Sequence, residues 1–104
     1  MNKQEIDNLF IKLYENADHR MAQSIEKTVP QWENFEIWRT ACRDAIEQVF
    51  GSNHRNLIEF NEIRFTPSND PNTPKEVLVS FIIGMSIASQ KLKVSNQTNP
   101  TLTS

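Results

Sequence analysis

The chain has 104 residues, of which 38% are apolar and 23% are charged, with 11 basic and 13 acidic side chains. This length suits one domain around a single core, and the composition is not that of a disordered chain. Charges of both signs are mixed along the sequence without a basic stripe, which disfavours nucleic acid as the primary partner because duplex binding needs clustered Lys and Arg. We therefore expect one helical domain over residues 1–94, followed by a polar tail or linker over residues 95–104.

The single cysteine and the lengths of the apolar runs indicate the cellular location of the protein. Cys42 is the only cysteine, so neither an internal disulfide nor a multi-cysteine zinc site can form. The first ten residues lack the apolar core of a signal peptide. The longest apolar-rich run, residues 77–88, is shorter than the roughly 18 residues expected of a membrane span. These features predict a cytoplasmic protein with no membrane partner.

Two amphipathic helices are predicted in the first half of the chain. Between Lys3 and about Lys27, apolar residues recur at spacings of three and four, and Pro30 then disfavours helical geometry in the residue before it. A second helical pattern follows within residues 31–51, with Gly51 as its C-terminal cap. Its stripe is wide enough to contact two neighbouring helices. The stripe consists of Phe35, Trp38, Ala41, Cys42, Ala45, Ile46, Val49 and Phe50.

A short helix and a loop are predicted next. The apolar residues from Leu57 onward suggest a third helix that ends near Glu62. The stretch TPSNDPNTP, residues 66–74, then contains three prolines and two asparagines, which predicts a loop.

The last helix has the clearest start signal in the chain. Thr73 is placed to cap it, Pro74 suits its first position, and Glu76 completes a capping box. The apolar pattern then predicts helix to about Lys93, and the small, uncharged residues from Ser95 predict a disordered tail. Four helices with short connections predict an all-α fold, a small four-helix bundle with one longer Pro/Asn-rich loop before its last helix.

Small side chains on the last helix form the first candidate interaction site. Ser80, Gly84 and Ala88 recur every four residues, so they form one groove along the helix. Glycine inside a helix costs about 1 kcal/mol relative to alanine, and its presence therefore indicates a close contact. The contacting helix can belong to the same chain, which we favour, or to a second chain.

An aromatic residue and two basic residues form the second candidate site. Trp32 is expected to pack at the entrance of the second helix. Arg39 and Arg43 lie one turn apart and could clamp an anion, although Glu36 and Glu47 are each spaced to pair with one of them. These three residues carry the alternative interpretation, a small-ligand or nucleotide-sensing domain.

No catalytic, cofactor-binding or metal-binding residue is predicted. Trp38 and Cys42 fall within an apolar stripe, which favours burial for both, and a buried thiol is a poor nucleophile. His19 and His54 are expected on the surface, because no neighbouring motif gives either one an acid–base role. We therefore expect a protein that is not an enzyme and has no cofactor.

Residues 32–92 resemble a known family module. They contain a Trp-bearing helix ending in VFG at residues 49–51, the pattern F-x-x-I-x-F-T-P at residues 60–67, and TP at residues 73–74 ahead of a helix with one glycine, Gly84. This order is similar to the N-terminal helical module found ahead of TIR-like, nucleotide-binding or nuclease effector domains in prokaryotic antiviral and conflict proteins.

The resemblance implies a regulatory or assembly module. It implies a protein partner, either a second copy of the chain in a homo-oligomer or an effector domain or chain, and it carries no catalytic residue. No effector follows the helices in this sequence, so the polar end suits a linker or a stand-alone form. The sequence thus predicts a non-enzymatic helical interaction module.

Overall fold

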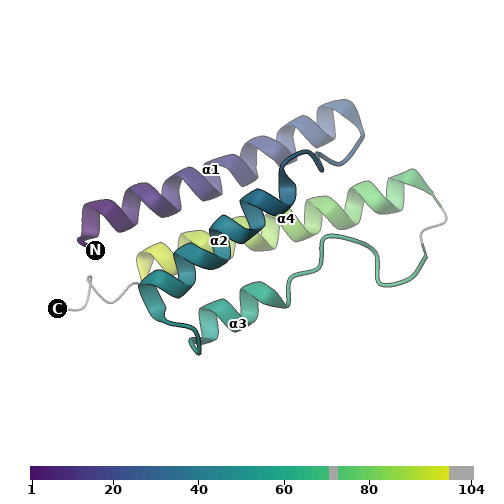
Figure 1. Cartoon of the computed structure of the whole chain (residues 1–104). Coiled ribbons are helices and arrows are strands. Elements are labelled where there is room, and N and C mark those ends of the chain that lie inside the picture. The colour runs from purple at the N-terminus through teal and green to yellow at the C-terminus, as the bar shows by residue number, and fades with distance from the viewer. Residues whose placement is uncertain (71–72, 99–104) are drawn as a thin grey trace.

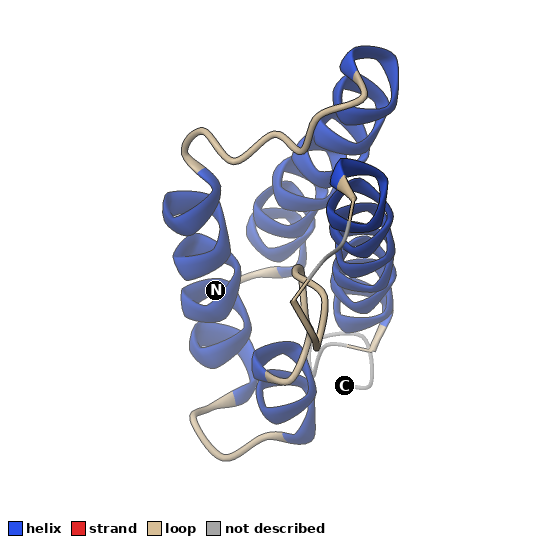
Figure 2. Cartoon of the chain, turned by 90° about the vertical axis from the view of Figure 1, so that its right-hand side faces the viewer, coloured by secondary structure: helices blue, strands red, loops and turns tan. Residues whose placement is uncertain are grey.

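The computed structural model describes residues 1–70 and 73–98, which form four α-helices. They are α1 (Lys3–Lys27), α2 (Phe35–Phe50), α3 (Arg55–Asn61) and α4 (Pro74–Gln97). The two long helices, α1 and α4, run antiparallel and make the most extensive contacts, while α2 packs on α1 and the short α3 packs on α2 and α4 (Figure 1). No strand occurs in these residues (Figure 2), which confirms the predicted all-α bundle.

Helix α1 has the predicted bounds because both ends are capped locally. The Asn2 side chain accepts a hydrogen bond from the backbone N–H of Glu5 over 2.9 Å. At the other end, Thr28 adopts a left-handed conformation with φ of 56°, and its N–H reaches the carbonyls of Ser24 and Ile25. A positive φ is unusual for a β-branched residue. The chain therefore turns sharply here, before Pro30.

Helices α2 and α3 are joined by a tight connection that begins at Gly51. Gly51 has the positive φ expected of a glycine cap, 98°, and its N–H donates to the Glu47 carbonyl over 2.7 Å. Helix α3 begins at Arg55 and ends at Asn61, one residue before the predicted end near Glu62. Its start is fixed by His54, whose Nδ1 accepts a hydrogen bond from the Asn56 N–H over 3.0 Å and so caps the helix.

Helix α4 begins as predicted and ends later. The Thr73 hydroxyl accepts a hydrogen bond from the Glu76 N–H over 3.2 Å, which confirms the predicted cap. The predicted end at Lys93 is wrong by four residues, because Ser95 is fully buried and the helix continues to Gln97 through the expected boundary at residues 94–95. The rest of the predicted tail, residues 99–104, lies outside the described residues.

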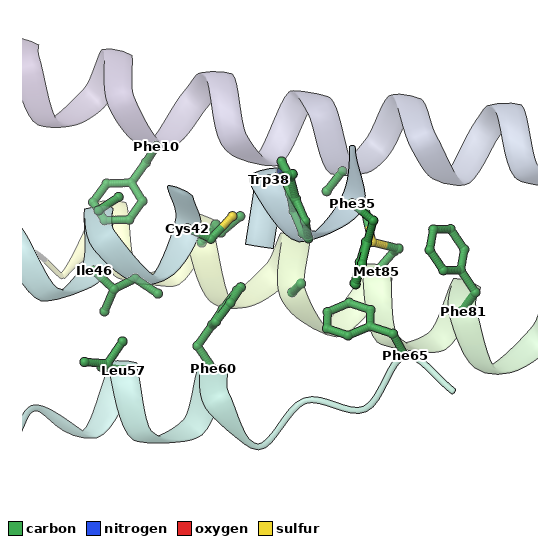
Figure 3. Packing of buried hydrophobic residues seen from close by; sticks show 14 of the residues in the cluster. Phe10, Phe35, Trp38, Cys42, Ile46, Leu57, Phe60, Phe65, Phe81 and Met85 are labelled. Carbon is green, nitrogen blue, oxygen red and sulfur yellow. The ribbon is translucent and has the colours of Figure 1, made fainter. Parts of the chain in front are cut away.

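The core lies between the helices and is rich in aromatic side chains (Figure 3). Its largest members come from every helix and are less than 2% exposed, as for Phe10 of α1, Ile46 of α2, Phe60 of α3, and Phe81 and Met85 of α4. Full burial of such a side chain contributes about 1.5–3 kcal/mol each. The bundle is therefore held mainly by apolar contact.

Polar contacts fix how α4 sits against its neighbours. On one side, the Ser89 hydroxyl donates to the Asp18 carboxylate of α1 over 2.7 Å, and Lys93 lies 3.4 Å from the same carboxylate. On the other side, Lys91 pairs with Glu59 of α3. These contacts place α1 and α3 along opposite flanks of α4 and leave a strip of the helix between them facing outward.

Candidate functional site

The predicted small-residue groove is filled by the same chain at Gly84, whereas Ser80 borders a surface hollow beside α4. Gly84 and Ala88 are fully buried on α4, and Ser80 is partly buried. A Cβ added to Gly84 would lie 2.4 Å from the Arg64 carbonyl oxygen and 2.7 Å from Cδ1 of Phe65. The contacting element is the irregular segment before the loop, and not the expected helix. The glycine permits a close internal contact.

The outward strip of α4 is apolar. Val79, Ile83 and Ile87 are 46%, 54% and 50% exposed, and their spacing of four places them in one row, which we call the outer stripe. No charged residue occurs between Val77 and Gln90. The helix thus presents large aliphatic side chains to solvent as well as to the core.

Sequence reasoning missed the outer stripe. The stretch between Val77 and Ala88 holds more apolar residues than one helical face can bury, and a helix that is apolar all round is normally enclosed on all sides. That excess was the available signal that part of α4 faces outward. Among the described residues, α4 has neighbours on only part of its circumference.

The apolar character of α4 also bears on membranes. By length and composition alone, α4 is long and apolar enough to cross a bilayer: an 18-residue window has a mean hydropathy of 1.5, and 33% of it is buried within the bundle. A core helix of a soluble protein meets the same test. Since α4 contributes Phe81, Met85 and Leu92 to the core, the observation is weak evidence for a membrane span.

A second group of exposed apolar residues lies where α1 turns toward α2. Ile25 and Val29 are 59% and 58% exposed, and Trp32 is 40% exposed. The Trp32 ring packs edge-on against Phe35 and Phe81, with centroids 5.2 and 4.8 Å away. Trp32 therefore lies at the entrance of α2 as predicted, where it covers part of the core.

The two arginines of α2, Arg39 and Arg43, differ in their ion pairing. Arg39 donates from Nη2 to both carboxylate oxygens of Glu36 over 2.7 Å, which confirms that predicted pair. Arg43 does not form its predicted pair with Glu47. The Nε atoms of both arginines are buried without a hydrogen-bond partner among the described residues. Arg39 therefore already has a carboxylate partner. The use of Arg39 and Arg43 as an anion clamp stays a prediction.

The other residues with reactive or polar ring side chains lie in different environments. Cys42 is fully buried, and this burial raises the pKa of its thiol, so the thiol stays protonated. Trp38 is also buried, and its indole N–H donates to the Leu13 carbonyl over 3.1 Å. His54 caps α3, and His19 is exposed on α1. In the described part of the chain, no three His, Cys, Asp or Glu residues are grouped to hold a metal ion.

Several surface hollows flank the bundle. One, of about 540 Å³, lies beside the first turns of α4 and is bordered by residues 67–70, Thr73, Lys75, Glu76, Val79 and Ser80. Another, of about 260 Å³, surrounds Arg20 of α1. Arg20 donates from Nη1 to the carbonyls of Gln31 and Glu33, so its charge secures the connection between α1 and α2.

Comparison with known proteins gives no assignment. No protein-family model matches the chain, and neither a curated protein nor a solved structure matches it. The resemblance to the helical modules of antiviral proteins therefore stays a prediction.

Proposed function

We propose that this chain is a non-enzymatic, cytoplasmic helical module for assembly or regulation, which binds another protein chain through the outer stripe of α4. The family resemblance supports the same class, the modules that precede effector domains in prokaryotic defence proteins. Under this proposal the partner is either a second copy or an effector protein.

The observation that carries the proposal is the exposure of the outer stripe. Contiguous exposed apolar side chains typically mark a binding surface, since burying them releases roughly 25 cal/mol per Å². Val79, Ile83 and Ile87 stand on a helix whose flanks are fixed by Asp18 of α1 and Glu59 of α3. A stripe on such a fixed helix needs little reorganisation to bind, which reduces the entropic cost of association.

The test compares two substitutions of exposed isoleucines. Ile83→Ser removes the centre of the outer stripe, and Ile37→Ser is the matched control on α2, where Ile37 is 71% exposed. Both should change the free energy of unfolding by no more than about 0.5 kcal/mol, as is usual for surface positions. Each variant and the unmodified chain are studied by sedimentation and by affinity capture from extracts of the native cell.

We expect the unmodified chain and Ile37→Ser to associate equally, and Ile83→Ser to bind about tenfold more weakly, which corresponds to about 1.4 kcal/mol. A chain that sediments as a strict monomer and also retains no protein would contradict the proposal. Undiminished binding by Ile83→Ser would contradict it as well.

A further inference from the structure

We infer that the partner on the outer stripe is a second copy of this chain, whose own α4 packs antiparallel across a two-fold axis at Ile83. This inference rests on the proposed function and adds the identity and geometry of the partner. The stripe suits such an axis, because Val79 and Ile87 lie four residues on either side of Ile83. In the pair, Ile83 faces Ile83, and Val79 of each copy faces Ile87 of the other, as a two-fold interface requires.

The centre of this interface contains no charge. Ser86 and Gln90 are exposed on the same face as the stripe, and both are small or neutral. The charge-free stretch from Val77 to Gln90 is 14 residues long, about 21 Å of helix at 1.5 Å per residue. Two such faces can therefore meet without burying an unpaired ion, which would be costly.

Charge complementarity between the two ends of the stripe favours a second copy in antiparallel orientation. Beside the first turn of α4, two acidic residues and one basic residue line the same hollow as Val79, and these are Asp70, Glu76 and Lys75. Beyond Ile87, two basic residues surround one acidic residue, because Glu59 is bound by both Arg55 and Lys91. The first end is thus net negative and the second net positive.

An antiparallel pair brings these unlike ends together twice. Glu76 and Lys91 are 15 positions apart, so they lie within about 60° of each other around the helix. A two-fold axis perpendicular to both helices places the side of α4 that carries these residues next to the same side of the partner copy's α4. Each negative end then meets the partner copy's positive end, where the Arg55 side chain is 85% exposed while it pairs with Glu59 of its own chain. A parallel pair would place ends of like charge together, which is unfavourable.

The size of the surface predicts a weak complex. A stable interface covers about 800 Å² on each partner. Three half-exposed aliphatic side chains supply only part of such an area, even with the charged ends added. We therefore expect an association in the micromolar range or weaker, with a dimer fraction that rises with concentration.

The test uses single cysteines as reporters of distance. Two cysteines join only when their Cα atoms lie within about 7 Å, and the native Cys42 is buried and so does not compete. Ile83→Cys should form a covalent dimer with itself under mild oxidation. Val79→Cys should not, but a mixture of Val79→Cys and Ile87→Cys should form the mixed dimer. Ile37→Cys, on α2, is the control and should form only the background amount.

The outcomes separate the inference from the proposed function. Self-joining of Val79→Cys without the mixed dimer would overturn the antiparallel geometry. Background-level joining of Ile83→Cys, together with monomeric sedimentation of the unmodified chain up to about 1 mM, roughly a thousandfold above micromolar affinity, would overturn self-association. If the unmodified chain then still bound another protein through Ile83, only this inference would fail and the proposed function would stand.

Discussion

The two faces of α4 are built from the same kinds of residue and have opposite surroundings. The inner face places Phe81, Met85 and Leu92 in the core at no measurable exposure. The outer face places Val79, Ile83 and Ile87 in solvent at about half exposure. What separates them is where the neighbours of α4 attach, with α1 held at Asp18 and α3 held at Glu59.

This difference shows that an apolar pattern identifies residues that favour burial but does not identify what buries them. The inner face is satisfied within the chain, since Gly84 admits the backbone of Arg64. The outer face has no counterpart among the described residues. A binding surface and a core surface can therefore share one helix and one composition.

The largest effect is expected from shortening a side chain on each face of α4 and comparing the losses of stability. Leu92→Ala should lower the free energy of unfolding by about 2–5 kcal/mol, because it leaves a cavity beside a fully buried position. Ile87→Ala, on the outer face, should change it by no more than about 0.5 kcal/mol. Urea unfolding followed by helical circular dichroism measures both. Equal losses would show that the two faces are buried to the same extent.

The next effect tests the close contact at Gly84. Gly84→Leu should destabilise the fold by about 1–3 kcal/mol or more, because even its Cβ would overlap the Arg64 carbonyl. Ser86→Leu, two residues away and exposed, is the matched control and should be nearly neutral. A Gly84→Leu variant that unfolds at the same urea concentration as the unmodified chain would disprove the contact.

A smaller effect is expected at the start of α4, which both faces share. Thr73→Ala should cost about 1 kcal/mol, because the Glu76 N–H loses its hydroxyl acceptor. Thr73→Ser keeps that acceptor and serves as the control. The melting temperature reports the difference, and an equal effect of both substitutions would rule out capping as the cause.

The pH dependence tests the attachment of α3 to α4. Hydrogen bonds from Lys91 and Arg55 lower the pKa of Glu59 from its ordinary 4.5 to about 2. The ionised carboxylate therefore stabilises the fold above pH 4.5, and this contribution is lost as the pH falls toward 2. Urea unfolding at pH 5 and at pH 2.5 should show that the free energy of unfolding falls more for the unmodified chain than for Glu59→Gln. An equal fall in both proteins would mean that the ion pairs of Glu59 do not stabilise the fold.

Much of the fold could be predicted because its signals are local. The spacing of apolar residues predicted the bounds of α1, and Thr73 with Pro74 predicted the start of α4. The late end of α4 could not be predicted in this way, since Ser95 and Gln97 look like tail residues and become helical through burial of Ser95. Likewise, nothing local signals that His54 caps α3.

The outer stripe was harder to predict because its exposure depends on which sides of α4 the other described helices cover. Gly84 was correctly interpreted as a site of close contact, but its neighbour is an irregular segment that no periodicity reveals. Ile83 and Ile87 resemble core residues in sequence, and only the positions of α1 and α3 show that they face outward. The pair expected between Arg43 and Glu47 is also absent, since spacing permits a pair without requiring it.

The central claim is that the outer stripe of α4 serves binding and contributes little to the fold. Its most direct test is the free energy of unfolding of Ile83→Ser, measured at a protein concentration low enough to keep the chain monomeric. We predict a value within about 0.5 kcal/mol of the unmodified chain. A loss of about 2 kcal/mol or more, as for a core isoleucine, would contradict the claim.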